Sequence, residues 1–490
     1  MKYTMRKSTR SPFGSDKVHE ECGVFGIYVH PDDAERLSPA HEAYAALFAL
    51  QHRGQEACGI SVNNDGVIRT HKDLGLVNDV FNQRILDGMP GNMAIGHVRY
   101  STTGLQSREN AQPLSITHCK GNLALAHNGN LVNAGSLRKS IELTGGIFNS
   151  SSDTEVLAYT IVQERLKCGS IEMAVLNAMS AIQGAYSLVI MSPRKLIAAR
   201  DPHGFRPLVI GKTGKSYIFC SETCALDTIG AEFIRDVEPG EVIVIEDGEL
   251  RSLHYPIKCD PTTCVFEYIY FARPDSVIDG ASVEMARQEA GRYLAEEHPV
   301  EADVVIGVPD SGIPAAIGYA KASGIPYGVG LIKNRYIGRT FIQPGQKNRE
   351  RSVRMKLNAL RFAVEGKRVI MVDDSIVRGT TCARLVKILR DAGAKEVHMR
   401  ISAPPFLHPC FFGTDVPDRE FLIAHGRTVE EIRDIVGVDS LGYLSIEATN
   451  KIAVGAKCGF CNGCFSGVYP IETPDTIEKN IFESGIGEHG

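Results

Sequence analysis

Two adjacent carboxylates followed by a short polar turn form the most informative segment of this chain. Asp373 and Asp374 come directly after the apolar run 369–372, and residues 375–381 read Ser-Ile-Val-Arg-Gly-Thr-Thr. Adjacent acids accept hydrogen bonds from the hydroxyl groups of a polyol such as ribose, and free N–H groups at the start of a helix bind phosphate. An ordinary acidic turn explains one aspartate better than two acids beside so many small polar residues. The segment therefore indicates a site for a phosphorylated sugar.

A buried strand and a helix must position these groups. Four consecutive apolar residues, 369–372, are typical of a parallel strand that is covered on both faces. A helix is predicted over Cys382–Ala392, ending at Gly393. Because ligands of an open α/β sheet bind at the carboxyl ends of its strands, this unit places the two acids where a ligand binds.

This segment resembles the signature of the phosphoribosyltransferases, which use 5-phosphoribosyl 1-pyrophosphate (PRPP). The resemblance implies that PRPP is bound by Asp373, Asp374, Ser375, Arg378, Gly379, Thr380 and Thr381. A second turn, Asp310-Ser311-Gly312, ends the predicted strand Asp303–Pro309 and alone is a plain β-turn. In the family this turn binds pyrophosphate, and Ser311 joins the two acids at positions associated with Mg²⁺, a hard ion that prefers oxygen. One Mg²⁺ per subunit, arriving with PRPP, is therefore implied.

A basic run lies between these two turns. Residues 333–356 hold eight Lys and Arg side chains and one Glu, a net charge of +7 within a chain of net charge −5. Such a run is usually a solvated or interaction surface. Lys333 and Arg335 occur where the family has a loop that closes on PRPP, so the resemblance implies a lid that neutralises pyrophosphate and excludes water.

A possible nucleophile lies near the other end of the chain. Cys22 is followed by Gly23 and an apolar run, which places a thiol at the start of a strand. Alone, such a cysteine is more often a buried structural residue. Three polar motifs follow it in order, at 97–104, 126–130 and 151–155.

Each later motif has a structural alternative. Asn128-Gly129 is a hairpin-turn dipeptide, which is compatible with a second role. Arg99 could form a surface ion pair, and Asp153 could cap the helix that follows it. The combination outweighs the separate alternatives, because the four motifs together resemble the class II glutamine amidotransferases over about residues 22–250.

That resemblance implies a fold of two stacked sheets between helices and assigns each motif a role. Cys22 attacks the glutamine amide to give a γ-glutamyl thioester and ammonia, with its own α-amine as base, which requires residues 1–21 to be a removable propeptide. The Asn128 side chain and the Gly129 N–H bind the oxyanion. Arg99 holds the substrate α-carboxylate, which suits a guanidinium fork, and Asp153 holds the α-amine. His97 and His127 are expected to be structural.

Three closely spaced cysteines near the end of the chain form a metal-type cluster. Cys458, Cys461 and Cys464 fit zinc or iron–sulfur, with a fourth ligand from elsewhere. The sequence offers Cys259, Cys264 and Cys410. The family resemblance selects a [4Fe–4S] cluster with a structural role, attaching the tail to the second domain and leaving Cys458 spare. Its implied ligands are Cys264, Cys410, Cys461 and Cys464.

The bulk composition describes a globular protein of two or three domains. The chain has 490 residues, of which 43% are hydrophobic and 23% charged. Its net charge of −5 does not indicate the basic surface that nucleic-acid-binding proteins carry. It has no apolar run long enough to cross a bilayer, and its basic start lacks the apolar core of a secretory signal. The 13 cysteines are therefore better explained by reduced thiols, catalysis or metal than by disulfides, as in a cytoplasmic enzyme.

The order of predicted elements divides the chain in two, and the class is α/β. Strands at 184–190, 196–199, 207–210 and 242–245 alternate with helices at 40–50 and 154–166. From about residue 264 the pattern is βαβ, with strands at 303–309, 369–372, 397–402 and 421–424 and a helix at 313–323. The Pro-containing stretch 254–263 is the expected boundary. The predicted parts are a propeptide (1–21), an N-terminal-nucleophile αββα domain (22–255), a type I phosphoribosyltransferase domain (264–457) and a cysteine-rich tail (458–490).

Over nearly its whole length the chain resembles the glutamine PRPP amidotransferases of the iron–sulfur, propeptide-bearing type. The implied reaction is glutamine + PRPP + H₂O → 5-phosphoribosylamine + glutamate + pyrophosphate, the first committed step of de novo purine synthesis, with ammonia passed between the two sites. The resemblance also implies a homotetramer inhibited by purine nucleotides. Two alternatives are a glucosamine-6-phosphate synthase, which lacks the 369–381 segment, and a non-enzymatic PRPP or nucleotide sensor, which has no need of the four amidotransferase motifs.

Overall fold

The computed structural model describes residues 22–100, 107–334, 357–414, 416 and 419–474, which divide between two units. The N-terminal unit contains the described residues of 22–286, 409–414 and 450–474. The C-terminal unit contains those of 287–408, 416 and 419–449. The chain thus returns twice to its first unit after building most of the second.

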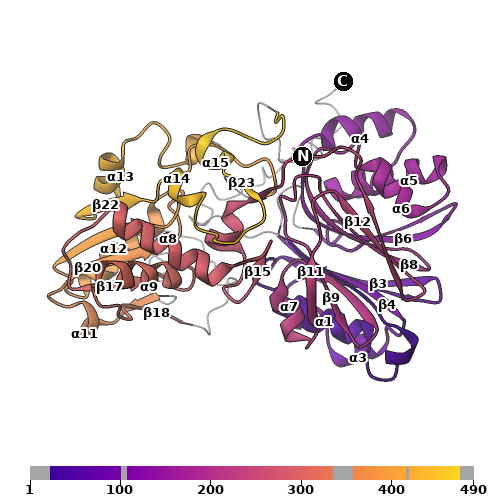
Figure 1. Ribbon diagram of the computed structural model, residues 1–490, viewed down its shortest axis with the longest axis horizontal. Helices are drawn as coiled ribbons and strands as arrows, with labels where there is room; N and C mark the ends of the chain where they lie inside the picture. The colour runs from indigo at the N-terminus through magenta and orange to yellow at the C-terminus, as the bar shows by residue number, and fades with distance from the viewer. Residues whose placement is uncertain (1–21, 101–106, 335–356, 415, 417–418, 475–490) are drawn as a thin grey trace, which may run out of the picture. The chain divides into compact units, whose positions relative to one another are not determined.

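Two antiparallel sheets stacked face to face form the centre of the N-terminal unit (Figure 1). The seven-stranded sheet has the order β11 (Glu232–Asp236), β9 (Val209–Thr213), β10 (Ser216–Cys220), β1 (Gly23–Tyr28), β4 (Met93–Arg99), β2 (Ala57–Asn64) and β3 (Val67–Leu74). The six-stranded sheet has the order β13 (Glu249–His254), β12 (Glu241–Glu246), β8 (Lys195–Arg200), β7 (Gly184–Met191), β6 (Gly121–Leu131) and β5 (Leu114–His118). The strand predicted at 207–210 begins only at Val209, because Pro207 has no N–H for the ladder.

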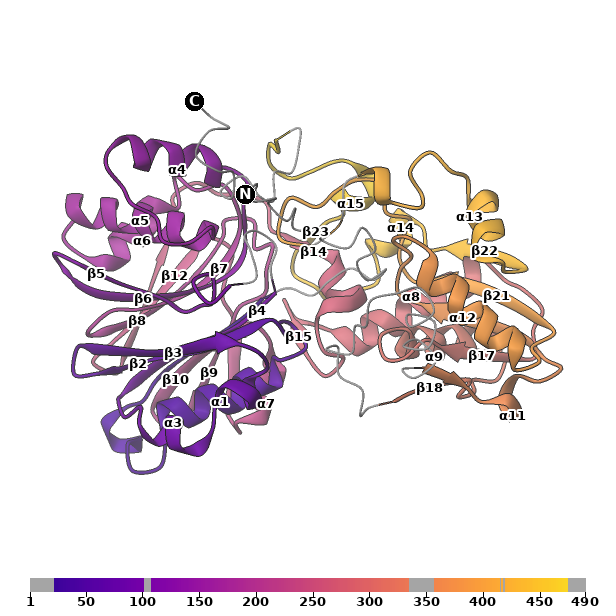
Figure 2. The same cartoon turned by 180° about the vertical axis from the view of Figure 1, so that it is seen from behind.

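Helices cover both outer faces of this sandwich (Figure 2). The seven-stranded sheet carries α1 (Pro39–Ala49), α2 (Val77–Val80), α3 (Gln83–Asp87) and α7 (Thr223–Thr228), with the short 3₁₀ helix η1 (Pro31–Asp33) preceding α1. The six-stranded sheet carries α4 (Ala134–Leu143), α5 (Asp153–Lys167) and α6 (Ile171–Ala178). The predicted αββα arrangement is confirmed.

Side-chain alternation along β1 explains why this strand is buried on both faces. Val24 and Tyr28 pack in the core between the two sheets, whereas Phe25 and Ile27 pack in the core beneath the helices. Successive residues of a strand point to opposite faces, so an unbroken apolar run serves both cores. Gly26 lets the sheets approach, since a Cβ atom there would lie 2.5 Å from Val189 Cγ1 of β7.

The cysteine-rich tail belongs to the N-terminal unit. β23 (Gly459–Cys461) pairs in parallel with β14 (Thr262–Cys264), which brings Cys461 opposite Cys264. The expectation that the tail is attached to the second domain was wrong, because Cys264 and the tail both belong to the N-terminal unit. The π-helix η2 (Glu267–Phe271), the hairpin β15 (Val277–Ile278) and β16 (Ala281–Ser282), and α15 (Gly463–Ser466) complete this region.

A parallel four-stranded sheet organises the C-terminal unit. Its order is β17 (Val304–Gly307), β20 (Arg368–Asp373), β21 (Glu396–Ile401) and β22 (Ser440–Tyr443). Figures 1 and 2 show α8 (Val283–Glu297) and α9 (Gly312–Ser323) on one face and α12 (Thr380–Asp391) on the other. Smaller elements are β18 (Leu331–Lys333), β19 (Leu357–Ala359), α11 (Arg361–Val364), η3 (Arg419–Phe421), α13 (Val429–Val436) and α14 (Ile446–Thr449).

One predicted strand of this unit is wrong. Phe421–Ala424 forms the end of η3 and a turn, and the sheet is extended by β22 instead. The short apolar run is buried by a different contact, because the Ile423 N–H donates to the Val377 carbonyl oxygen at 2.8 Å in the loop after β20. Periodicity alone does not distinguish such a buried turn from a strand.

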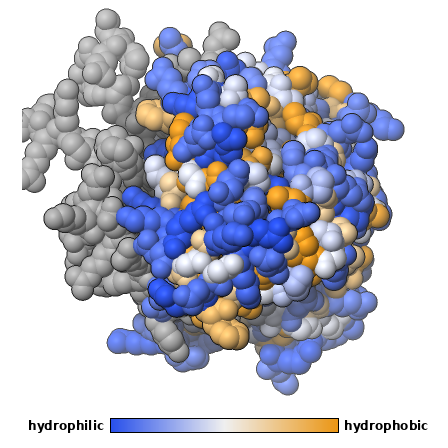
Figure 3. Space-filling view, turned by 90° about the vertical axis from the view of Figure 1, so that its left-hand side faces the viewer, coloured by the Kyte–Doolittle hydropathy of each residue, from blue (hydrophilic) through white to orange (hydrophobic). Residues whose placement is uncertain are grey.

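The described surface is polar over most of its area on the side of Figure 1 where α13 lies. Figure 3 shows hydrophobic residues scattered there among hydrophilic ones. Among the helices of the described residues, none is long and apolar enough to cross a membrane.

Candidate functional site

Strand pairing brings Cys22 beside Arg99. β1 runs antiparallel to β4 with Gly23 opposite Val98, so the residue before Gly23 lies next to the residue after Val98. The Cys22 side chain is buried, and its Sγ lies 3.5 Å from the Tyr100 carbonyl oxygen. The predicted nucleophile and the predicted carboxylate-binding arginine thus share one end of the seven-stranded sheet.

A contact between two histidines joins this end to the other sheet. His97 Nε2 of β4 lies 2.9 Å from the His127 carbonyl oxygen of β6. Both rings are buried, which lowers the pKa of His97 to about 3 and also lowers that of His127. Neutral, buried rings with defined partners fit the structural role that we expect for both histidines.

Asn128 and Gly129 lie inside β6, with Asn128 opposite Ser187 of β7. The hairpin-turn role considered for this pair is therefore wrong, since the strand continues beyond it. The Asn128 side chain is 1% exposed, and neither of its amide atoms has a hydrogen-bond partner among the described residues. Gly129 has φ +149°, and a Cβ atom there would lie 1.9 Å from the Ala185 carbonyl oxygen. The site therefore requires glycine at 129 and leaves the buried amide of Asn128 facing no partner in this part of the chain.

Asp153 brings a carboxylate to the same stretch of β6. It is the first residue of α5, and its Oδ2 accepts a hydrogen bond from the Leu131 N–H at 3.1 Å. Its Oδ1 lies 3.9 Å from His127 Nδ1. The alternative role of Asp153 as N-cap is wrong, because Ser152 Oγ caps the helix by accepting from the Thr154 N–H at 3.2 Å. The Asp153 carboxylate thus contacts residues on both sides of Asn128-Gly129.

The second predicted site lies where two strands of the C-terminal unit end. Ser311 Oγ, in the turn after β17, donates a hydrogen bond to Asp374 Oδ2 after β20. Ser375 Oγ donates to Asp374 Oδ1 at 2.7 Å, and the Asp374 N–H donates to Asp373 Oδ1 at 3.0 Å. Gly312 permits this approach, since a Cβ atom there would lie 2.5 Å from the Val372 carbonyl oxygen. With helices on both faces of the sheet, this is the point where α/β folds bind ligands.

A helix N-terminus adjoins the two acids. α12 begins at Thr380, two residues before the predicted start, and its N-cap Gly379 has φ +83°. Thr380 and Thr381 form the first turn, where the positive end of the helix dipole favours an anion. The Arg378 guanidinium lies 5.7 Å from the centre of the Phe421 ring. Acids, hydroxyls and a helix N-terminus are thus brought together.

The basic run meets this site at its first residue. Lys333 Nζ, at the end of β18, lies 2.5 Å from Asp310 Oδ2 in the turn after β17. Arg335 and the rest of the run to residue 356 lie outside the described residues, so the lid stays a prediction.

Four cysteines line one small pocket of the N-terminal unit. The lining residues are Phe205, Cys264, Phe266, Cys410, Phe412, Thr414, Cys461, Cys464 and Tyr469. Burial raises the pKa of Cys461 to about 12, and burial together with the three other thiols raises the pKa of Cys464 well above its ordinary value. Among the described residues no group of three or more His, Cys, Asp and Glu side chains is arranged to hold a metal ion. The pocket nevertheless gathers the four predicted cluster ligands, which come from three separate segments.

Cys458 has a different partner from Cys464. Its Sγ lies 3.7 Å from Asp279 Oδ2, and the Asp279 carboxylate is held by Arg200 through contacts of 2.7 and 2.9 Å. Cys458 is absent from the lining of the pocket. The structure therefore distinguishes Cys464, which lines the pocket, from Cys458, which does not, whereas their spacing in the sequence could not.

Sequence reasoning missed a buried group of charges next to Cys22. Arg53 Nε donates to the Cys22 carbonyl oxygen at 3.0 Å, and Arg53 forms ion pairs with Glu222 and Glu267. Burial opposes ionisation of Glu267, but Arg53 and Arg206 lower its pKa below the ordinary value. No spacing rule connects these residues, because they come from a turn, the N-cap of α7 and a π-helix.

Two family models match the chain, one in each half. A glutamine amidotransferase domain matches residues 97–228, which include Arg99, Asn128 and Asp153. A phosphoribosyl transferase domain matches residues 283–404, which include Ser311 and Asp373.

The chain is also similar to characterised proteins over nearly its full length. An amidophosphoribosyltransferase of Bacillus subtilis is 51% identical over 474 residues, covering 95% of this chain and 98% of that protein. One of Methanocaldococcus jannaschii is 51% identical over 466 residues, with 92% and 98% covered. The solved structure of glutamine PRPP amidotransferase from B. subtilis, complexed with ADP and GMP, matches with a TM-score of 0.87 and 50% identity, covering 94% of this chain and 100% of that one.

Proposed function

This chain belongs to the amidophosphoribosyltransferase family, and on that premise we propose how its residues divide the reaction. The reaction is glutamine + PRPP + H₂O → 5-phosphoribosylamine + glutamate + pyrophosphate, which supplies purine synthesis. We assign ammonia release to the N-terminal unit and its use to the C-terminal unit. The observation that carries this division is the pairing of Gly23 with Val98, which sets Cys22 beside Arg99.

In the N-terminal unit, Cys22 is the nucleophile. Its thiolate attacks the glutamine amide carbon, and the proton passes to the Cys22 α-amine once residues 1–21 have been removed as a propeptide. The resulting oxyanion is bound by the Asn128 amide and the Gly129 N–H, a role supported by the buried Asn128 side chain, whose amide has no partner among the described residues. Ammonia leaves, and water hydrolyses the thioester to glutamate.

Two charged side chains hold the amino-acid end of glutamine. Arg99 pairs with the α-carboxylate, and Asp153 pairs with the α-ammonium group. Both side chains are buried at the end of the sandwich where Cys22 lies. Burial strengthens such charge-assisted hydrogen bonds, so these two contacts set the affinity for glutamine.

In the C-terminal unit, Asp373 and Asp374 bind the ribose hydroxyls and the start of α12 binds the 5-phosphate. Ammonia attacks the ribose C1, and pyrophosphate leaves from the same carbon. The oxygens of Ser311, Asp373 and Asp374 suit Mg²⁺, and the Ser311–Asp374 contact brings this donor set together. Bound Mg²⁺ neutralises charge on the pyrophosphate. Lys333 and Arg335 are proposed to close over this group and exclude water.

The four cysteines of the pocket are proposed to hold a [4Fe–4S] cluster. Four thiols around one pocket are the ligand set of either a tetrahedral zinc site or a [4Fe–4S] cluster, and the resemblance to the iron–sulfur members of the family favours the cluster. When bound, the cluster cross-links the segments of Cys264, Cys410 and Cys461–Cys464, a structural task.

Membership of this family also suggests how the enzyme is regulated and assembled. The solved B. subtilis relative is complexed with ADP and GMP, and we propose that purine nucleotides inhibit this enzyme too. We also propose a cytoplasmic homotetramer in which ammonia passes internally from the first site to the second, because phosphoribosylamine is labile and ammonia is easily lost.

One assay tests the proposed function. The anaerobically purified protein is incubated with glutamine, and glutamate and pyrophosphate are measured with and without PRPP and Mg²⁺. Equal release of both products that depends on PRPP supports the coupling. Glutamate release that does not depend on PRPP contradicts it, and absence of turnover in protein that begins at Cys22 contradicts the nucleophile assignment.

A further inference from the structure

The backbone of the proposed nucleophile is held by a buried arginine. Arg53 Nε donates to the Cys22 carbonyl oxygen at 3.0 Å, and Arg53 is 1% exposed. Arg53 lies in the turn between α1 and β2. The following residue, Gly54, lets this turn press on β4, since a Cβ atom there would lie 2.6 Å from the Arg99 backbone nitrogen. The turn that carries Arg53 therefore contacts both Cys22 and Arg99.

Glu267 fixes the orientation of the Arg53 guanidinium. Its Oε1 lies 2.8 Å from Arg53 Nη2 and its Oε2 lies 3.0 Å from Arg53 Nη1, a two-pronged contact. Glu222 adds a contact of 2.6 Å to Arg53 Nη1, and all three side chains are fully buried. A planar guanidinium bound along one edge by a carboxylate keeps Nε in a defined direction, here toward the Cys22 carbonyl.

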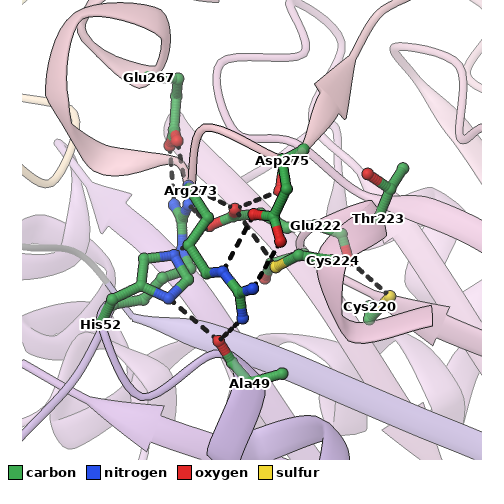
Figure 4. A network of polar contacts seen from close by, with 12 residues as sticks. Ala49, His52, Cys220, Glu222, Thr223, Cys224, Glu267, Arg273 and Asp275 are labelled. Atoms are coloured by element: carbon green, nitrogen blue, oxygen red, sulfur yellow. Dashed lines mark hydrogen bonds and ion pairs between the residues drawn. The ribbon is translucent and has the colours of Figure 1, made fainter. Parts of the chain in front are cut away.

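Glu222 has further partners that Glu267 lacks. Figure 4 shows Glu222 in a network with His52 and Arg273. His52 Nε2 lies 2.7 Å from its Oε1, and the Arg273 N–H and Ser276 Oγ donate to its Oε2 at 2.9 and 2.7 Å. Glu222 thus contacts several segments, whereas the side-chain contacts of Glu267 among the described residues are with Arg53 and Arg206.

Arg206, the second arginine that contacts Glu267, also contacts a residue of the cysteine pocket. Arg206 Nη1 lies 3.3 Å from Glu267 Oε1, and Arg206 Nε donates to the Phe412 carbonyl oxygen at 3.1 Å. Phe412 lines the pocket of four cysteines, and Glu267 follows Cys264 by three residues. A chain of buried contacts therefore runs from this pocket through Glu267 to the backbone of Cys22.

We propose that Glu267 is a positioning residue for the Cys22 nucleophile, acting through Arg53; this rests on the proposed glutaminase role of Cys22. Among the described residues, the Glu267 side chain pairs with Arg53 and Arg206, neither of which is assigned to glutamine binding. Its loss should therefore lower kcat for glutamine hydrolysis and leave KM nearly unchanged. A misplacement of about 1 Å at a reacting group costs on the order of 100-fold in rate.

The test compares Glu267→Gln with Asp279→Asn in the full, processed, anaerobic enzyme. Asp279 is a matched control, because it is also a buried carboxylate paired at two points with an arginine of the same unit. For Glu267→Gln we expect kcat with glutamine to fall roughly 10- to 100-fold, KM to change less than about twofold, and synthesis with added ammonia to persist. The rate of covalent labelling of Cys22 by a diazoketone analogue of glutamine, measured by intact mass, should fall in parallel. Asp279→Asn should keep the unmodified kcat per folded molecule.

The outcomes are distinct. A folded Glu267→Gln enzyme with unmodified kcat and labelling rate overturns the inference, as does an equal loss with glutamine and ammonia. If Glu267→Gln does not fold, Glu267→Asp keeps the charge but shortens the side chain, and the same readouts apply to it. Failure of the unmodified protein to hydrolyse glutamine instead contradicts the proposed function.

Discussion

His97 Nε2 lies 2.9 Å from the carbonyl oxygen of His127, and this contact joins the two stacked sheets beside Cys22 and Asn128. The His97 ring is fully buried between the two sheets, and from there its N–H donates to the backbone of the six-stranded sheet. The two halves of the proposed glutaminase site, one on β4 and one on β6, are therefore aligned by a neutral histidine.

This burial predicts a pH dependence of stability. Burial lowers the pKa of His97 to about 3, whereas a histidine of the unfolded chain titrates near ~6.5. Between these values the unfolded chain binds more protons, so the free energy of unfolding should fall as pH falls, by up to about 1.4 kcal/mol per pH unit. In His97→Gln, which keeps an N–H donor but does not titrate, Tm should fall less between pH 7 and pH 5 than in the unmodified protein. Equal Tm losses would contradict this origin.

Removal of the nucleophile should separate the two half-reactions. Cys22→Ala, in protein made to begin at residue 22, should lose glutamine-dependent synthesis and keep synthesis from added ammonia. The Ala side chain cannot form the thioester, but the PRPP site needs ammonia alone. Pyrophosphate release with each nitrogen source measures both activities. Loss of both would refute the division of labour.

The ribose site should respond to a loss of charge with either nitrogen source. Asp373→Asn should raise KM for PRPP by about 10-fold or more, which corresponds to loss of a charge-assisted hydrogen bond of ~1.5 kcal/mol. Asp303→Asn is a control, because Asp303 forms an exposed ion pair with Arg368 at the other end of β20. Such a surface ion pair contributes little to the stability of the fold. Unchanged PRPP kinetics in Asp373→Asn would remove this residue from the site.

The cysteine assignment predicts opposite results for two neighbouring thiols. Cys464→Ser should lose bound iron and sulfide, because Cys464 lines the pocket. Cys458→Ser should keep both, because Cys458 contacts Asp279 instead. Iron and sulfide contents of anaerobic protein, with the visible absorption of the cluster, measure the difference. If Cys458→Ser lost iron and Cys464→Ser kept it, Cys458 would be the ligand in place of Cys464.

Local patterns in the sequence were enough to identify most elements and the candidate residues. The apolar run 369–372 followed by two acids predicts a buried strand that ends at a ligand site, and the structure has β20 and α12 there. Neighbours within a few positions are enough to recognise a buried strand, the start of a helix or a pair of acids. These features can therefore be predicted without knowledge of the fold.

Contacts between distant segments were decided only by the tertiary structure. The pairing of Cys264 with Cys461 put the tail in the N-terminal unit, and the Asp279 contact set Cys458 apart from Cys464. Phe421–Ala424 was apolar enough for a strand but was buried as a turn.

The contact of Arg53 with Glu267 shows the same limit at the site itself. An arginine and a glutamate far apart in a sequence look like two surface charges, and only the folded chain removes both from water and aims one at Cys22. The sequence by itself determined which chemistry the residues can do. The tertiary structure decided which of them meet, because burial and pairing depend on partners that no local spacing specifies.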